Sequence, residues 1–289
     1  MKIKILIPVY NDFQSLSKVI QEINSIISSL DEEFSIIIVN DASTDKTEID
    51  VSSIDKIHSI KILNIKKNQG HARCIATGLK YIFENEEFNY VIPMDGDGED
   101  RPEEIKNFVE SIKLNKDKLI VGKRVKRLES LFFKVCYNIH KLITYTFTGK
   151  SIKFGNFTSL PSATVEKVIN EKATWSSFSG ALSKVEKDKV EIPSIRGKRY
   201  FGPSKMSFLN LVKHSLAIIS VFRFNVLVRS ILFLIVYIFS ISKNISNITM
   251  IPFYVIILLN ILTFYFSKRE NINKLNSSLE NIEGVDQIK

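Results

Sequence analysis

Residues 90–98 read YVIPMDGDG, an apolar run that ends in two aspartates separated by one glycine. The apolar part is bounded by polar residues and predicts a β-strand. Side chains two positions apart on extended backbone point to the same side, which brings the carboxylates of Asp95 and Asp97 together. Gly96 between them lets a ligand approach the backbone. The stretch is therefore typical of a ligand-binding edge of a sheet.

A divalent cation is the ligand that this pair predicts. Hard carboxylate oxygens suit Mg²⁺ or Mn²⁺, and a cation held by only two side chains keeps positions open for phosphate oxygens. Acidic turns are also common on protein surfaces, so a solvated loop is the alternative. The position directly after an apolar strand favours the cation site, with Asp95 and Asp97 as its ligands.

The sequence around this stretch alternates between strand and helix patterns. Further strands are predicted at residues 2–9, 34–40, 60–65 and 119–122. Apolar residues recur every three or four positions over 16–30 and 72–82, which predicts helices between the strands. This order predicts an α/β fold, a mostly parallel sheet that is flanked by helices.

Polar residues follow each of the first four predicted strands, at residues 10–12, 40–44, 68–70 and 95–98. Because the carboxyl ends of parallel strands meet at one edge, these loops are expected to form one pocket. Asp41 could accept hydrogen bonds from a base or ribose, or it could cap the following turn.

The cluster at 68–70, Asn-Gln-Gly, precedes a predicted helix. The free N–H groups of a helix start could bind phosphate. His71, at this start, is interpreted either as a ligand or as an ordinary surface residue.

The C-terminal part has a different, strongly apolar character. Residues 206–224 mix apolar and basic side chains, which is typical of a helix lying in a membrane interface. Two apolar stretches follow, Val226–Ser242 and Ile248–Phe266, and both approach the roughly 20 residues that span a bilayer. They predict a transmembrane hairpin; the alternative is one spanning helix with a buried or re-entrant one.

Positive charges lie at the two open ends of the predicted hairpin. They are Arg223, Arg229, Lys268 and Arg269, while the turn offers only Lys243. The positive-inside bias therefore places both ends in the cytoplasm, and Arg229 is expected to reach the headgroups. The predicted organisation is a catalytic domain over 1–205, an interfacial helix over 206–224, a transmembrane hairpin over 225–267, and a polar cytoplasmic tail over 268–289, solvated and partly disordered.

The composition is that of a folded protein with anionic partners. The 289 residues are 45% hydrophobic and carry a net charge of +9. This excludes a disordered chain and a disulfide scaffold. The charge suits a phosphorylated ligand, an acidic lipid surface or a nucleic acid. Nucleic-acid binding is disfavoured, because an apolar hairpin has no role there and the basic residues form no single stripe with interleaved aromatics.

Four motifs in order resemble a known enzyme family. They are IPVYN at 7–11, VNDAS at 39–43, NQG at 68–70 with Gly78-Leu79 behind it, and MDGD at 94–97 with Pro102-Glu103. This series resembles that of the family 2 glycosyltransferases, which have the GT-A fold. RYFGPSK at 199–205, followed by Phe222-Arg223 and the hairpin, is similar to the polyprenyl-phosphate branch, the dolichol-phosphate mannose synthase and bactoprenol glucosyltransferase type.

The resemblance implies a nucleotide-sugar donor, UDP- or GDP-linked, and inversion at the anomeric carbon. The donor-binding residues that it implies are Pro8, Tyr10, Asn11, Asp41, Gly70, Arg73, Asp95 and Gly96. Asp95 and Asp97 would hold Mg²⁺ or Mn²⁺ and, with Asn156, form the catalytic set. The residues predicted to position an acceptor phosphate are Arg124, Arg127, Arg199 and Lys205.

The chain departs from the polyprenyl-phosphate branch at residues 156–158. An Asp-Phe-Arg pattern is common in that branch, and here Asn156-Phe-Thr158 replaces it. An amide cannot act as a strong base. A lipid phosphate remains a feasible acceptor because it is already anionic; an acceptor that already bears a sugar is the alternative. Trp175 is interpreted either as a sugar-stacking residue or as a buried side chain under a loop.

The sequence thus predicts a multi-pass protein of the cytoplasmic (inner) membrane whose catalytic domain faces the cytoplasm. The predicted reaction is metal-dependent, inverting hexosyl transfer from a nucleotide sugar to polyprenyl phosphate. Extension of a saccharide in cell-surface polysaccharide synthesis is the alternative within the enzyme class. A pocket that binds without turnover is a third hypothesis, which the intact Asp41, Asp95 and Asp97 disfavour. A homo-oligomer is compatible with the sequence, and no nucleic-acid partner is expected.

Overall fold

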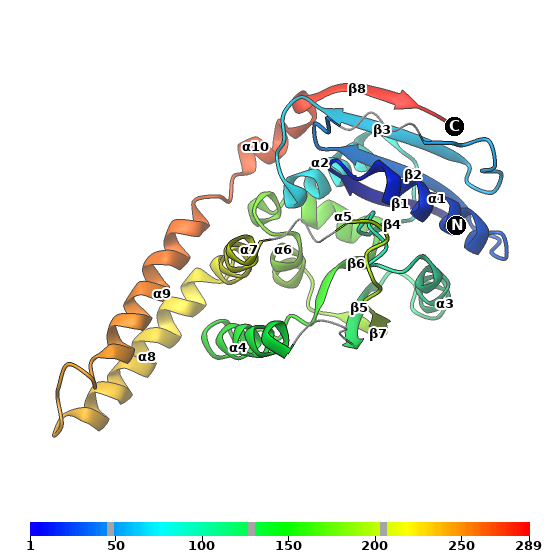
Figure 1. The fold of residues 1–289 in the computed structure, drawn as a ribbon. Helices are drawn as coiled ribbons and strands as arrows, with labels where there is room; N and C mark the ends of the chain where they lie inside the picture. The colour runs from blue at the N-terminus through cyan, green and yellow to red at the C-terminus, as the bar shows by residue number, and fades with distance from the viewer. Residues whose placement is uncertain (45–48, 127–130, 203–206) are drawn as a thin grey trace.

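The strand β1 (Lys2–Val9) lies in the middle of the sheet (Figure 1). All of its residues after Lys2 are buried. The structure is a computed structural model, and it describes residues 1–44, 49–126, 131–202 and 207–289. A strand covered on both faces requires a nearly continuous apolar sequence, and KIKILIPV provides it.

Within the described residues, eight strands form one sheet in the order β7-β5-β6-β4-β1-β2-β3-β8. The others are β2 (Glu33–Asn40), β3 (Ser59–Ile65), β4 (Tyr90–Pro93), β5 (Leu119–Lys126), β6 (Phe154–Pro161), β7 (Lys189–Ile195) and β8 (Ile282–Gln287). β1 pairs in parallel with β2 and β4, and β2 with β3; β6 is antiparallel to β4 and β5. β7 is parallel to β5, and β8 is antiparallel to β3. The mostly parallel sheet and the five predicted strands are confirmed.

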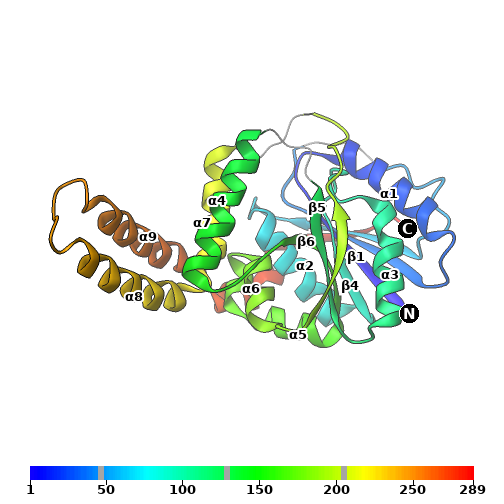
Figure 2. The same ribbon diagram turned by 90° about the horizontal axis from the view of Figure 1, so that it is seen from below.

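Helices cover both faces of the sheet (Figure 2). One face carries α1 (Phe13–Ile27) and α3 (Ile105–Leu114), and the other carries α2 (His71–Asn85), α5 (Ser162–Ile169) and α6 (Phe178–Val185). The alternation of β1 divides the core: Ile5 and Ile7 pack with α1, whereas Leu6 packs with α2. A Cβ at Gly78 of α2 would lie 2.3 Å from Leu6 Cδ1, so only glycine permits this close packing.

The second half of the sheet-forming chain was not predicted as regular structure. It contains β6, β7, α4 (Leu131–Thr148), α5 and α6. The predicted strand at 119–122 is longer in the structure, because β5 continues to Lys126 along β7. Lys123 and Arg124 therefore lie within the strand rather than after it.

The C-terminal tail was predicted to be solvated and partly disordered; much of it is exposed, but it is ordered, so the prediction of disorder is wrong. It forms α10 (Ile272–Asn276) and then β8, which extends the sheet beyond β3 (Figure 1). Leu275 is fully buried against Ala76 and Trp175. Backbone pairing with an edge strand needs no apolar pattern, which explains why a polar sequence is ordered here.

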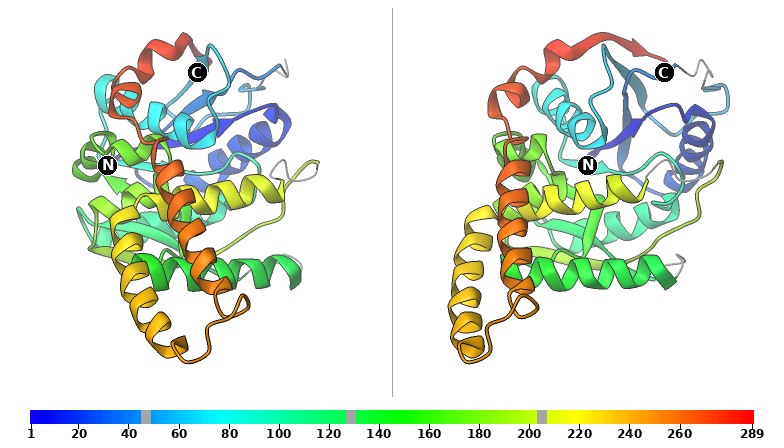
Figure 3. Two further views of the ribbon diagram at one scale, coloured as in Figure 1. Left: turned by 90° about the vertical axis from the view of Figure 1, so that its left-hand side faces the viewer. Right: turned by 60° about the vertical axis from the view of Figure 1, so that its left-hand side comes forward.

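Two helices, α8 (Arg223–Ile241) and α9 (Ile251–Ser267), project from the rest of the molecule as an antiparallel pair (Figures 1 and 2). α8 and the helical stretch Ile251–Asn276, which begins with α9, are long and apolar enough to cross a membrane by length and composition, and few of their side chains are buried. α7 (Phe208–Ser220) lies within the predicted interfacial segment. Figure 3 shows α4 and α7 running across the direction of the pair near its base.

Arg229 of α8, which was expected to reach the headgroups, is exposed and contacts α4. Its Nη1 donates a hydrogen bond to the carbonyl of Thr146, 3.0 Å away, at the C-terminal end of that helix. Asn225 donates to the carbonyl of Thr148 at 3.2 Å. Positive charge near the last carbonyls of a helix is stabilising, so this contact attaches the hairpin to α4.

An ion pair fixes the base of the hairpin. Arg223 Nη1 lies 2.9 Å from Glu270 Oε2, and the Glu270 side chain is only 2% exposed. The pair joins the first residue of α8 to the chain that follows α9. Removing one partner of a buried pair leaves an uncompensated charge.

We therefore expect Arg223→Ala to lower the free energy of unfolding by about 3–5 kcal/mol. Thermal unfolding of the detergent-solubilised chain would measure the effect. Lys243→Ala, in the exposed hairpin turn, is the matched control. Replacing both partners with leucine should cost less than the single change; equal stability of Arg223→Ala and Lys243→Ala would contradict the assignment.

Candidate active site

Asp95 lies directly beyond β4 and contacts the neighbouring β6 and α2. Its Oδ1 accepts a hydrogen bond from Asn156 Nδ2 at 3.3 Å and lies 3.4 Å from His71 Nε2. Asn156 Nδ2 is 2.7 Å from the same histidine nitrogen. Burial acts to raise the pKa of Asp95, but the electrostatic effects of His71 and Arg124 outweigh it and hold that pKa below its usual value. Asp95 is therefore an ionised group.

Asp97 is paired with Arg199, from a segment more than a hundred residues later. Arg199 Nη1 lies 2.8 Å from Asp97 Oδ2, while Oδ1 accepts a hydrogen bond from the backbone N–H of Glu99 at 3.0 Å. The same guanidinium also contacts Asp12, which follows β1. Burial and the neighbouring Asp95 raise the pKa of Asp97 to about 6. Arg199 thus bridges two of the loops that follow the parallel strands.

A third acid, Asp100, forms a hydrogen bond with the backbone of the loop that carries Asp95 and Asp97. Its Oδ2 accepts a hydrogen bond from the backbone N–H of Asp95 at 3.0 Å, and its Oδ1 lies 3.8 Å from Arg124 Nη2. Burial, and then the charge of Asp95, raise the pKa of Asp100 to about 7. A Cβ at Gly155 would lie 2.8 Å from Arg124 Nη2, so glycine gives the guanidinium its space. Asp100 was not predicted, although it lies in the polar run that follows β4; Asp12 was predicted only as a member of the polar cluster at 10–12, without a partner.

Residues 196–201, here called the 196–201 segment, lie across this loop. The N–H of Gly197 donates to the carbonyl of Glu99 at 2.8 Å, and the N–H of Tyr200 donates to that of Asp97 at 3.0 Å. Gly98 has φ +88°, and a Cβ there would lie 2.7 Å from the Tyr200 ring. The loop and the segment are therefore packed backbone to backbone, which fixes the position of Arg199.

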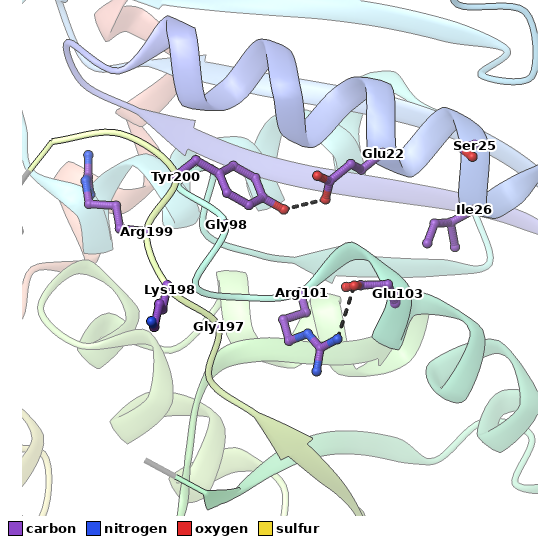
Figure 4. A pocket seen from close by; sticks show the side chains of 10 residues that line it. All are labelled: Glu22, Ser25, Ile26, Gly98, Arg101, Glu103, Gly197, Lys198, Arg199 and Tyr200. Atoms are coloured by element: carbon purple, nitrogen blue, oxygen red, sulfur yellow. Dashed lines mark hydrogen bonds and ion pairs between the residues drawn. The ribbon is translucent and has the colours of Figure 1, made fainter. Parts of the chain in front are cut away.

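An open pocket lies between this segment and α1 (Figure 4). It is lined by Glu22, Ser25, Ile26, Gly98, Arg101, Glu103, Gly197, Lys198, Arg199 and Tyr200. Figure 4 shows the Tyr200 hydroxyl directed at Glu22 and Arg101 paired with Glu103. The hydrogen bond from Tyr200 to Glu22 connects the 196–201 segment to α1 across this pocket.

Asp41, at the end of β2, holds the start of α2. Its two carboxylate oxygens accept hydrogen bonds from the backbone N–H groups of Gln69 and Gly70, at 2.6 and 2.8 Å. The prediction that N–H groups at this helix start could bind phosphate therefore does not extend to the N–H groups of Gln69 and Gly70, which Asp41 occupies. Asp41 is buried, and its negative charge lies at the positive end of α2.

The loops after β1 and β2 are bonded to each other. The backbone N–H of Asn11 donates to Ser43 Oγ at 2.9 Å, and Asn11 Oδ1 accepts from the N–H of Thr44 at 2.7 Å. Asn11 and Ala42 have positive φ angles of 51° and 56°. Such conformations persist only where surrounding contacts hold them, and they gather at ligand sites. The loops thus form a second, more polar part of the same sheet edge.

Asp95 and Asp97 fit the requirements of a Mg²⁺ or Mn²⁺ site that is completed by a ligand. Among the described residues, no group of three or more His, Cys, Asp or Glu side chains could hold a cation alone. The contacts of Asp95 with Asn156 and His71 are made by Oδ1, which leaves Oδ2 directed elsewhere. Phosphate oxygens and water would complete the coordination. Arg199 would exchange Asp97 Oδ2 for another partner when a cation binds there.

The remaining predicted site residues lie away from the acidic loop or outside the described residues. The guanidinium of Arg73 lies 5.4 Å from the centre of the Trp175 ring. Trp175 is buried, which confirms the interpretation of this tryptophan as a packed side chain. Burial, and then the nearby Arg269, lower the pKa of Arg73. Arg127 and Lys205 lie outside the described residues. Pro8 is buried in β1 and Tyr10 is exposed at its end.

The chain is similar to one protein family in sequence and to several solved structures in fold. The model of glycosyl transferase family 2 matches residues 4–164, more than half of the chain. The crystal structure of S. aureus TarS 1-349 in complex with UDP-GlcNAc is 14% identical, with a TM-score of 0.53, and the match covers 97% of this chain and 89% of that one. Glucosyl-3-phosphoglycerate synthase from Mycobacterium tuberculosis, in complex with Mn²⁺, UDP and phosphoglyceric acid, is 13% identical with a TM-score of 0.55; the match covers 78% of each chain. At these identities the likeness is one of fold.

Proposed function

Because the chain belongs to glycosyl transferase family 2 and has the GT-A fold, we propose that it transfers a sugar from a UDP- or GDP-linked donor to polyprenyl phosphate. The reaction would take place at the cytoplasmic face of a membrane, with inversion at the anomeric carbon. The observation that carries this proposal is the position of Arg199. It contacts Asp97 at the candidate donor site and lies nine residues before Phe208, where the apolar C-terminal helices begin.

The donor would lie along the edge formed by the loops after β1, β2 and β4. Its nucleoside would lie near Asn11 and Asp41, and its diphosphate near Asp95 and Asp97. The similar structures of TarS and glucosyl-3-phosphoglycerate synthase hold UDP-GlcNAc and UDP, which supports a uridine nucleotide as the first donor to test. The bonds between Asn11, Ser43 and Thr44 would present a fixed surface to the nucleoside.

The departing nucleoside diphosphate gathers negative charge as the sugar–phosphate bond breaks. A divalent cation bound by Asp95 and Asp97 would stabilise that charge. Mn²⁺ is present with the synthase in its complex, which supports the same requirement here. The Arg124 guanidinium would help to keep Asp95 ionised, and Asp100 would hold its backbone in place.

An anionic acceptor suits the residues around Asp95. A phosphate oxygen already carries charge, so it needs positioning by cations more than a general base. Asn156 is no base, and its amide instead orients toward Asp95 and His71. Arg199 and Arg124 lie on the two flanks of the acidic loop, where they could hold a phosphate beside the donor.

The apolar helices would hold the acceptor lipid close to this site. α8 and α9 would cross the membrane, and α7 would lie in its interface, where its Phe208, Leu209 and Val212 are exposed. The basic residues at the base of the pair, compared with Lys243 alone at its turn, favour a cytoplasmic catalytic domain.

A saccharide acceptor is the second candidate, and one observation favours it. A hydroxyl acceptor needs a base, and the His71 side chain is 45% exposed beside Asp95. The fold neighbour from M. tuberculosis is a glucosyl-3-phosphoglycerate synthase, so its named product is not a lipid.

A transfer assay separates the two candidates. Purified chain in detergent would receive radiolabelled UDP- and GDP-sugars with Mn²⁺ and either undecaprenyl phosphate or an oligosaccharide. We expect label that extracts into organic solvent and is released by mild acid, as a glycosyl phosphate linkage requires. Label found only in an elongated, water-soluble saccharide would replace the lipid acceptor by the second candidate.

A further inference from the structure

The C-terminal strand β8 is connected to the loop after β2 by a continuous chain of side-chain hydrogen bonds. Asp286 Oδ2 accepts from Asn64 Nδ2 at 2.7 Å, and Asn64 Oδ1 accepts from Asn40 Nδ2 at 2.8 Å. Asn40 Oδ1 then accepts from the backbone N–H of Ser43 at 3.0 Å. The chain of bonds thus crosses two strands, from β8 over β3 to the end of β2.

The sheet geometry brings these side chains into line. Asn40 and Asn64 are direct partners in the parallel pairing of β2 and β3. Asn64 lies opposite Gly284 of β8, and Asp286 is two positions further along on the same face. Nothing lies within 4 Å of a Cβ at Gly284, so Asn64 reaches diagonally to Asp286 without obstruction.

The carboxylate at the end of this chain fixes its direction. An ionised aspartate only accepts hydrogen bonds, so Asn64 must turn its NH₂ group toward Asp286. Its carbonyl oxygen is then directed at Asn40, which must in turn present its own carbonyl to the Ser43 N–H. Without this carboxylate, the Ser43 N–H alone would favour the orientation of the two amides that binds Ser43, so the carboxylate strengthens that preference from the other end of the chain of bonds.

The far end of the chain lies in the candidate donor site. Ser43 Oγ accepts from the N–H of Asn11, and Asp41 and Ala42 lie between Asn40 and Ser43. Ala42 has φ 56°, so the loop depends on its neighbours to keep its shape. The orientation of the Asn40 side-chain amide therefore decides whether the loop at 41–43 already has its shape before the donor binds.

We infer that β8 is part of the donor-binding machinery and that Asp286 is a positioning residue, which acts through Asn64 and Asn40 on the loop that receives the donor's nucleoside. The inference rests on the proposed function, since that function places the nucleoside at this loop. A preformed loop binds its ligand without an ordering cost, so loss of the relay should weaken donor binding and leave the chemical step intact.

The direct test is Asp286→Lys in the full chain, with UDP and GDP in the presence of Mn²⁺ as probes. A lysine only donates, so Asn64 must turn its carbonyl outward and its NH₂ toward Asn40, which breaks the chain of bonds. We expect nucleoside diphosphate affinity, measured by calorimetry, to fall about tenfold, as for a hydrogen bond to a charged group. The donor KM should rise in parallel, with kcat within about twofold of the unchanged chain.

The matched control and the rescue use the same strand. Glu283→Lys makes the same charge change at an exposed position of β8 and should leave affinity unchanged. Adding Asn64→Asp to Asp286→Lys restores an acceptor both for the introduced lysine and for Asn40, and should recover most of the affinity. A merely structural role for β8 predicts no such rescue.

The outcomes are distinguishable. If the unaltered chain binds neither UDP nor GDP, the proposed function fails. If it binds one of them and Asp286→Lys binds equally well, or loses no more than Glu283→Lys, the inference is overturned. Asp286→Ala is the milder variant should the lysine variant unfold; it should still weaken binding severalfold, and unchanged affinity would again overturn the inference.

Discussion

Asp97→Asn is expected to reduce sugar transfer by about 10²- to 10³-fold, the effect of removing one electrostatic partner of a reaction's developing charge. The asparagine keeps the size of the side chain and can still accept a hydrogen bond from the N–H of Glu99. It loses the negative charge that a divalent cation and Arg199 both require. Transfer assays across a Mn²⁺ titration would measure the loss.

Two controls define the result. Asp117→Asn removes a charge from an exposed turn, where φ is 60° and asparagine is well tolerated, and should leave transfer unchanged. Membrane association of Asp97→Asn should equal that of the unaltered chain, because the apolar helices are untouched. Transfer at a normal rate, equally dependent on Mn²⁺ in both chains, would exclude Asp97 from the cation site.

The first half of the fold was predictable because its signals are local. The burial of β1 on both faces requires the unbroken apolar run that residues 2–9 display, and the helical period of α1 is visible over four turns. The polar loops that follow these strands gather at one edge by the geometry of parallel pairing alone. Asp95 and Asp97 could therefore be placed there without any tertiary information.

The prediction of a partly disordered C-terminal tail was wrong because the order of the tail depends on a strand that is far away in the sequence. β8 reads IEGVDQ and is largely exposed, so it has no apolar period of its own. The backbone of β8 pairs with β3, which lies more than 200 residues earlier in the sequence. The side chain of Asp286 accepts a hydrogen bond from Asn64 of that strand. A pattern search along the chain cannot detect pairing that is carried by backbone and amide groups.

The candidate site shows the same division. Asp41 was identified, but its role in binding the Gln69 and Gly70 N–H groups depends on how β2 and α2 meet in space. Arg199 was assigned to a phosphate, and its contacts with Asp97 and Asp12 appear only once the 196–201 segment is folded over the acidic loop. Residue types were readable from the sequence, whereas their partners were not.

Arg199→Ala is expected to lower kcat/KM for the acceptor about 10²-fold, and to do so more strongly than kcat/KM for the donor. The change removes a charge-assisted donor from the flank where an acceptor phosphate would lie, and it leaves Asp12 and Asp97 without their shared counter-charge. Arg199→Lys should recover part of the activity, because a lysine keeps the charge but cannot bridge two carboxylates with a planar fork.

The affinity for Mn²⁺ is an independent measurement on the Arg199→Ala variant. If Asp97 holds the cation as proposed, Arg199 would compete with it for Asp97 Oδ2, so Arg199→Ala should bind Mn²⁺ alone more tightly while it transfers more slowly. Lys198→Ala, the exposed neighbour in the same segment, removes the same charge and should alter neither property. An equal loss for donor and acceptor, with unchanged Mn²⁺ affinity, would mean that Arg199 only holds the segment in place.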